Sequence, residues 1–336
     1  MDFRGYRLES RLGAGSMSIV YRAVNTSIGM PAAVKIMNRE IVADESYRKR
    51  FHNEAHVMSL VQHPNVIELY EYIDTGSEMA IIMELVDGRT LGHMISSETG
   101  PLPWERALRI TRQAAAGVDA GHQRGIIHRD IKPSNIMVTY DDQVKILDMG
   151  IALGRQSHRL TRAGDMVGTL YYLAPEIIQG KGHSMQSDVY ALGMTLYEVL
   201  TGTVPLGDSE SSEFDIMNAI IHQNVPDPRE FYPHIPAEVV NIVQRSTDKD
   251  PAVRYSTMFE LMADMDAALG EGAPELAGRP EIQEVPAPAY EGYNSAQSNG
   301  LLEWFLSQPV VGRTAVVAVL LIVIFNVTRA VLINSL

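Results

Sequence analysis

The sequence predicts an α+β protein of two lobes, the first rich in strands and the second rich in helices. Residues 6–86 carry short apolar runs separated by glycine-bearing turns, with one helical segment among them. Beyond residue 100, apolar residues recur at the three- and four-residue spacing of helices. A chain of 336 residues is also longer than one average domain, which is consistent with two lobes.

The composition restricts the classes of function. The net charge of −13 argues against a general binder of nucleic acid or of anionic surfaces. The sequence contains no cysteine, which excludes disulfides and thiolate metal sites. The hydrophobic share of 46% is sufficient for a sizeable core.

The first lobe begins with three expected strands, over residues 6–8, 12–21 and 31–37. Gly13 and Gly15 lie in the second of these segments, where they form a turn. Glycine allows a turn to lie close over a ligand, so that backbone N–H groups can face phosphate oxygens.

One helix is expected in this lobe, over residues 46–62, and Pro64 ends it. Glu54 lies beside its apolar face. The residues that form this face are Phe51, Ala55, Met58 and Val61. Two further strands are expected within residues 66–86.

The second lobe is expected to be helical, and Gly202 is the expected C-cap of one of its helices. The helices are expected over residues 103–124, 187–201, 214–223, 236–246 and 257–269.

One polar motif lies between the apolar runs of this lobe. It reads His128-Arg129-Asp130-Ile131-Lys132-Pro133-Ser134-Asn135, and Asp148 follows thirteen residues after its end. The motif and Asp148 together supply an acid, a cation, an amide and a second acid on loops between short strands. This set suits a site that handles a hydroxyl, a phosphate and a divalent metal together.

The last part of the chain changes in character. Residues 270–308 combine glutamate with Pro, Ala, Gly and Ser, which is typical of an acidic linker. The segment 309–333 is apolar, and as a helix it would extend about 36 Å, enough to cross a bilayer core of roughly 30 Å. We therefore expect a membrane helix there. A shorter buried or dimerising helix is the alternative, because Arg313 and Arg329 bracket only about 15 residues.

Taken together, these motifs resemble those of Hanks-type Ser/Thr protein kinases, most closely the bacterial transmembrane members. The resemblance covers about residues 3–269. It implies a bilobal protein-kinase fold over residues 1–269, with an N-lobe over 1–86 and a C-lobe over 87–269. A C-terminal apolar helix would follow the linker.

The resemblance implies an ATP site in the cleft between the lobes. The strand lysine Lys35 would pair with Glu54 to hold phosphates, and Ser18 replaces the third glycine of the family's loop. The residues implied at the nucleotide are Leu12, Gly13, Gly15, Val20, Ala33, Lys35, Glu54, Met83, Glu84, Val86, Met137 and Asp148.

Catalysis is implied for Asp130 as the base or orienting group, Lys132 as the stabiliser of charge, and Thr169 as their contact. Asn135 and Asp148 would ligate Mg²⁺ or Mn²⁺. Lys132 followed by Pro133, which lies within the motif above, resembles the Ser/Thr-specific version of the loop.

Regulation is implied for the segment that ends in Ala174-Pro175-Glu176. Thr161, Ser157 and Thr169 are candidate phosphosites, and Arg129 would receive such a phosphate. Met149 replaces the family's usual Phe, which affects packing rather than chemistry. Structural roles are implied for Asp188, which would cap the catalytic loop, and for a buried ion pair of Glu176 with Arg254.

The function implied by the resemblance is transfer of the γ-phosphoryl group of ATP to Ser or Thr of proteins, including the chain's own activation loop in a homodimer. No nucleic-acid partner is expected. The expected location is the inner cell membrane, as a single-pass protein with its kinase domain in the cytoplasm; the alternative is a cytoplasmic protein. A nucleotide-responsive pseudokinase scaffold is the alternative function.

Overall fold

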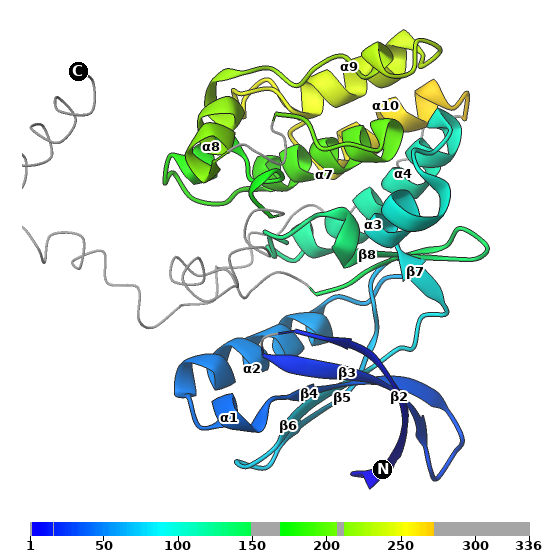
Figure 1. Cartoon of the computed structure of the whole chain (residues 1–336), viewed down its shortest axis with the longest axis vertical. Helices are drawn as coiled ribbons and strands as arrows, with labels where there is room; N and C mark the ends of the chain where they lie inside the picture. The colour runs from blue at the N-terminus through cyan, green and yellow to red at the C-terminus, as the bar shows by residue number, and fades with distance from the viewer. Residues whose placement is uncertain (1, 16, 149–168, 207–211, 272–336) are drawn as a thin grey trace, which may run out of the picture. The chain divides into compact units, whose positions relative to one another are not determined.

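The computed structural model describes residues 2–15, 17–148, 169–206 and 212–271. Within them the larger sheet and one long helix form one lobe, and the other long helices form the second, as expected (Figure 1). The linker and the segment 309–333 lie outside the described residues. Among the described helices, none has both the length and the apolar character needed to cross a membrane.

The first lobe is built on a six-stranded sheet in the order β1-β2-β3-β4-β6-β5, with all its neighbours antiparallel. The strands are β1 (Asp2–Phe3), β2 (Tyr6–Ala14), β3 (Ser18–Asn25), β4 (Pro31–Met37), β5 (Leu69–Asp74) and β6 (Met79–Met83). The predicted strands are all present, and β2 extends well beyond the predicted first segment, with two register shifts in its pairing with β3.

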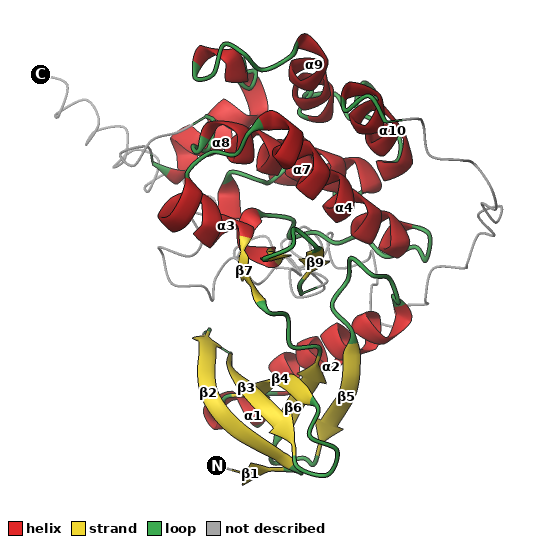
Figure 2. Cartoon of the chain, turned by 90° about the vertical axis from the view of Figure 1, so that its right-hand side faces the viewer, coloured by secondary structure: helices red, strands yellow, loops and turns green. Residues whose placement is uncertain are grey.

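Helix α2 (Glu45–Leu60) packs against this sheet through the face that the sequence predicts. Phe51, Ala55 and Met58 are buried there against the apolar side chains of β4 and β6. The Asp44 carboxylate accepts a hydrogen bond from Ser46 N and so caps the helix. Figure 2 shows α2 alongside the strands.

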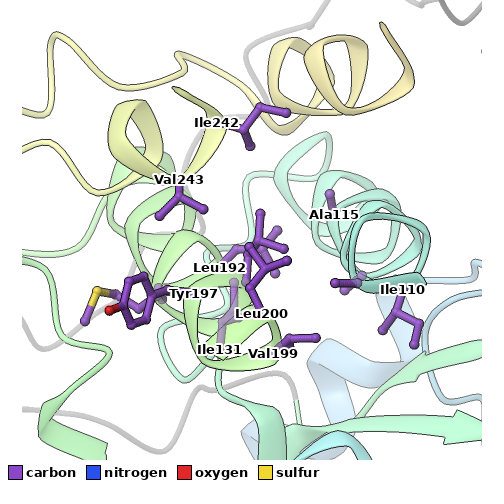
Figure 3. Close-up of a cluster of buried hydrophobic side chains, with 14 of the residues drawn as sticks. Ile110, Ala115, Ile131, Leu192, Tyr197, Val199, Leu200, Ile242 and Val243 are labelled. Carbon is purple, nitrogen blue, oxygen red and sulfur yellow. The ribbon is translucent and has the colours of Figure 1, made fainter. Parts of the chain in front are cut away.

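The second lobe holds the largest core, formed by long helices that are apolar on their inner faces. These helices are α4 (Trp104–His122), α7 (Met185–Thr201), α8 (Glu213–His222), α9 (Ala237–Ser246) and α10 (Met258–Ala268). Gly202 ends α7 in the left-handed region, with φ of 77°, which confirms the predicted C-cap. Ile131, from the polar motif, is 2% exposed and lies among these core side chains (Figure 3).

A small antiparallel sheet joins the two lobes. It consists of β7 (Gly88–Thr90), β8 (Ile136–Thr139) and β9 (Val144–Ile146). Ile146 N donates to Asn65 O at 2.8 Å, and Ile67 N donates to Ile146 O at 3.0 Å. Gly117 of α4 allows this close approach, since a Cβ there would lie 2.7 Å from Asn65 O.

Several short elements were not predicted. They are α1 (Arg39–Val42), α3 (Leu91–His93), the π-helix Met94–Thr99, the 3₁₀ turns Pro133–Asn135 and Pro228–Glu230, and α6 (Pro175–Ile178). Segments of three to six residues are too short to show an apolar period, so their conformation depends on caps and tertiary contacts.

Candidate active site

Lys35 is the meeting point of three elements distant in the sequence. Its Nζ lies 2.6 Å from Glu54 Oε1 on α2 and 3.0 Å from Asp148 Oδ1, which follows β9. The side chains of Lys35 and Glu54 are only 13% and 15% exposed. A buried ammonium is costly unless it is paired, and this one has two carboxylates.

The shifts in pKa follow from this geometry. Burial alone would lower the pKa of Lys35, but Asp148 and Glu54 outweigh burial and raise it. Burial raises the pKa of Glu54 to about 7 although Lys35 opposes it, whereas Lys35 holds the pKa of Asp148 below its usual value. Asp148 is therefore the more firmly ionised carboxylate of the two, as an acid that binds cations must be.

A second polar cluster surrounds Asp130. Its Oδ1 lies 3.0 Å from Lys132 Nζ, and its Oδ2 accepts a hydrogen bond of 2.8 Å from Asn135 Nδ2. Lys132 Nζ also donates to Thr169 Oγ1 at 3.0 Å. Asn135 Nδ2 makes a second bond to the backbone oxygen of Asp130. Within the described residues no hydrogen bond reaches the amide oxygen of Asn135, which can therefore accept another ligand.

The two clusters are adjacent through the backbone. Leu147 N donates to Asn135 O at 2.8 Å, which fixes the residue before Asp148 against the end of the motif. The ring of His128 contacts Leu147 O through Nε2 at 3.3 Å. Asp148 and Asn135 are thereby held on neighbouring segments.

The loop that carries Asp130 is held by hydrogen bonds to the buried carboxylate of Asp188, which is 1% exposed. Asp188 Oδ2 accepts from His128 N at 2.8 Å and from His122 Nε2 at 2.8 Å, and its Oδ1 accepts from Arg129 N at 2.9 Å. Burial alone would raise the pKa of Asp188, but these hydrogen bonds outweigh burial and lower it.

These hydrogen bonds support a strained backbone. Arg129 has φ of 70°, in the left-handed region that a non-glycine residue adopts at a cost of about 1 kcal/mol. Ile131 adds a second anchor because it is buried in the core of the helical lobe. Asp130 thus lies between a residue held by Asp188 and a residue held by apolar packing.

The predicted nucleotide residues fall into two groups. Ala33 and Met83 are directly paired across β4 and β6 and belong to one apolar cluster, against which Val20 and Val86 pack. Met137 lies on β8. Leu12, which is 53% exposed, and Gly13 lie near the end of β2, and Gly15 lies in the turn after it, where Gly15 N donates to Ser18 O at 2.8 Å.

The donor set fits a magnesium ion bound together with phosphates. The described residues hold no group of three or more His, Asp or Glu side chains arranged to bind a metal alone. Mg²⁺ is commonly held by one or two carboxylates, with substrate phosphates and water completing its shell. Asp148 and the free amide oxygen of Asn135 match that arrangement.

Comparison with known proteins identifies the family. Residues 6–265 match the family model of the protein kinase domain, which is well over half of the chain. The chain belongs to the protein kinase family.

Named relatives of this kinase are bacterial serine/threonine-protein kinases. PknE of Mycobacterium tuberculosis is 34% identical over 292 residues, which cover 86% of this chain and 51% of PknE. PrkC of Bacillus subtilis is 35% identical over 263 residues, which cover 78% of this chain and 40% of PrkC. The chain spans about half the length of PknE and less of PrkC.

A solved kinase structure shows the same fold. The crystal structure of the PknI kinase domain of Mycobacterium tuberculosis aligns with a TM-score of 0.61 and 26% sequence identity. The alignment covers 80% of this chain and 97% of that domain. The predicted two-lobed kinase fold is thereby confirmed.

Among the remaining predicted residues, Glu176 and Arg254 form a bidentate ion pair, with both bonds at 2.8 Å. The Nε of Arg129 is buried and has no hydrogen-bond partner within the described residues. Ser157, Thr161 and Met149 lie outside the described residues, so their predicted roles stay predictions.

Two residues near the kinase site were not predicted. His122 binds the Asp188 carboxylate, and Lys145 of β9 forms an ion pair with Glu84 at 2.8 Å. His122 gave no signal in the sequence, because a histidine on an apolar helix face is ordinary. Lys145 was visible as the polar residue between Val144 and Ile146, but its partner is 61 residues away.

The geometry predicts that Asp188→Asn destabilises the kinase fold. One carboxylate oxygen becomes an NH₂ group that faces a buried donor, which should lower the free energy of unfolding by about 2 kcal/mol or more. Denaturant unfolding measures this, with Asp87→Asn as the control because Asp87 is exposed. Hydrogen exchange at the His128 and Arg129 amides should accelerate only in Asp188→Asn. Equal stability of the two variants would contradict the role of Asp188.

Proposed function

We propose that this chain is an ATP-dependent protein kinase that transfers the γ-phosphoryl group to Ser or Thr hydroxyls of proteins. The observation that carries the proposal is the pair of adjacent clusters, one of Lys35 with two carboxylates and one of Asp130 with Lys132 and Asn135. Its relatives PknE and PrkC bear the name serine/threonine-protein kinase, which supports the acceptor class.

In this mechanism Asp130 accepts or orients the proton of the acceptor hydroxyl. Lys132, 3.0 Å from Asp130, stabilises negative charge on the group that is transferred. Glu54 holds the ammonium of Lys35 in place, and this ammonium binds the α- and β-phosphates. The contact of Lys35 with Asp148 can then be exchanged for the phosphates. Thr169 bridges the activation segment to Lys132.

Asp148 and Asn135 would hold Mg²⁺ or Mn²⁺ through oxygen atoms. The ion, when bound, neutralises charge on the β- and γ-phosphates. The adenine would lie between Val20 and Ala33 above and Met137 below, with its edge at the backbone of residues 84–86.

Regulation by autophosphorylation between two copies is part of the proposal. Thr161 and Ser157 are the candidate sites, with Thr169 as a further hydroxyl near the catalytic loop. The buried Nε of Arg129, which has no hydrogen-bond partner among the described residues, supports this, because a guanidinium beside Asp130 can bind a phosphate on the segment that ends at Glu176.

The first test is phosphoryl transfer by the purified full chain, with radiolabelled ATP, Mg²⁺ and a basic acceptor protein. Asp130→Asn should lower the rate by at least about 100-fold, because the acceptor proton loses its base. Asp141→Asn, in the turn that follows β8, is the matched control and should retain the rate. Chelation of the metal should abolish transfer. A pseudokinase would give wild type and Asp130→Asn the same background rate under every metal condition.

We also propose that residues 309–333 cross the inner membrane once and hold the kinase on its cytoplasmic side, where ATP is present. The support is compositional, since residues 315–325 carry no polar side chain. A helix that is apolar on every side fits lipid better than it fits a half-exposed position.

The membrane proposal predicts that the full chain stays with membranes during alkaline carbonate extraction. A chain shortened at residue 308 should be released. Leu320→Arg combined with Leu321→Arg should also be released, because each charge at the centre of a span costs about 3 kcal/mol. Release of the full chain itself would contradict the proposal and favour the shorter buried or dimerising helix.

A further inference from the structure

Residues 84–87, the linking segment between β6 and β7, are held by an ion pair of Glu84 with Lys145. Glu84 N donates to Glu68 O at 2.9 Å, and the Glu84 carboxylate in turn accepts from Glu68 N at 3.3 Å. The same carboxylate oxygen accepts from Lys145 Nζ at 2.8 Å. The side chains of Lys145 and Glu84 are only 20% and 24% exposed, so water screens the pair less than it screens a surface pair.

Lys145 lies beside a residue proposed to contact adenine. It is directly paired with Met137 across β8 and β9. Directly opposed residues of an antiparallel pair project from the same face of the sheet. The Lys145–Glu84 pair therefore connects two parts of the proposed adenine site. One is the β8–β9 pair, which carries Met137, and the other is the linking segment, residues 84–87.

On the side of the linking segment that faces the pocket, the described residues do not supplement the ion pair with close apolar packing. Residues 84–87, the turn at 139–141 and Lys145 all line one open pocket of about 480 Å³. Leu85 and Val86 are only partly buried, and Asp87 is exposed. Leu85 and Val86 pack against the apolar cluster that contains Ala33 and Met83. On the pocket side, the linking segment is held by the ion pair of Glu84 with Lys145.

We propose that Lys145 is a positioning residue for nucleotide binding, which acts by fixing the linking segment through Glu84. This proposal rests on the proposed kinase function. Without Lys145, the Glu84 carboxylate is left mostly buried and unpaired, and it would turn toward water. The linking segment would then be less ordered in the free protein, and nucleotide binding would have to order it.

The test compares the full chain, in detergent, as wild type, Lys145→Met, Lys145→Arg and Glu84→Gln, together with the double variant of Lys145→Met and Glu84→Gln. Arg106→Met is the matched control, because Arg106 forms a similar ion pair with Asp142 at 2.8 Å but ties the β8–β9 turn to α4 instead of to the linking segment. The readouts are the Kd of Mg·ADP by calorimetry, the KM for ATP, kcat and the melting temperature.

Lys145→Met should raise the Kd of Mg·ADP and the KM for ATP by about threefold to tenfold, with kcat within about twofold of wild type. Lys145→Arg should bind as wild type does, because it keeps the charge. Glu84→Gln and the double variant should match Lys145→Met, since one contact is lost in all three. Arg106→Met should not change nucleotide binding.

The proposal is overturned if Lys145→Met lowers the melting temperature without changing Kd, or if Arg106→Met raises Kd equally. It is also overturned if kcat falls while Kd stays constant. If the wild type transfers no phosphate, the proposed kinase function is wrong. The positioning role of Lys145 is then judged from the calorimetric Kd of Mg·ADP alone. If Lys145→Met does not fold, Glu84→Gln is measured in its place, and an unchanged Kd of Mg·ADP for Glu84→Gln would overturn the proposal.

Discussion

The contact on which the site depends is the ammonium of Lys35 between the carboxylates of Glu54 and Asp148. It joins β4, α2 and the segment after β9, so it fixes a helix and a loop relative to the sheet at once. A buried cation is stable only while its partners remain, which makes the arrangement sensitive to any movement of α2. The raised pKa of Glu54 and the lowered pKa of Asp148 show how unequal the two partners are.

The loop that carries Asp130 is held by a different means. Asp188 accepts three hydrogen bonds below it, and Ile131 inserts into the apolar core of the helical lobe (Figure 3). The left-handed backbone of Arg129 is kept in place by these anchors on either side of Asp130. The polar side chains of this loop are thus anchored in the core of the helical lobe, whereas the residues around the proposed nucleotide come from both lobes.

Much of this was predictable from the sequence. The apolar positions of α2 and α4 recur at helical spacing, and the polar motif with Asp148 has a spacing that singles out its chemistry. The π-helix at 94–99 and the pairing of Lys145 with Glu84 were not predictable, because neither has a local signal. Contacts between residues far apart in sequence require the fold itself.

The measurement that tests the central claim most directly is phosphosite mapping by mass spectrometry of the full chain, produced identically as wild type and as Asp148→Asn. The account predicts phosphate on Ser or Thr residues of the wild type, including residues 157–169, and none on Asp148→Asn. The same phosphates on both proteins, or phosphate on neither, would contradict the view that the Lys35, Glu54 and Asp148 cluster serves phosphoryl transfer.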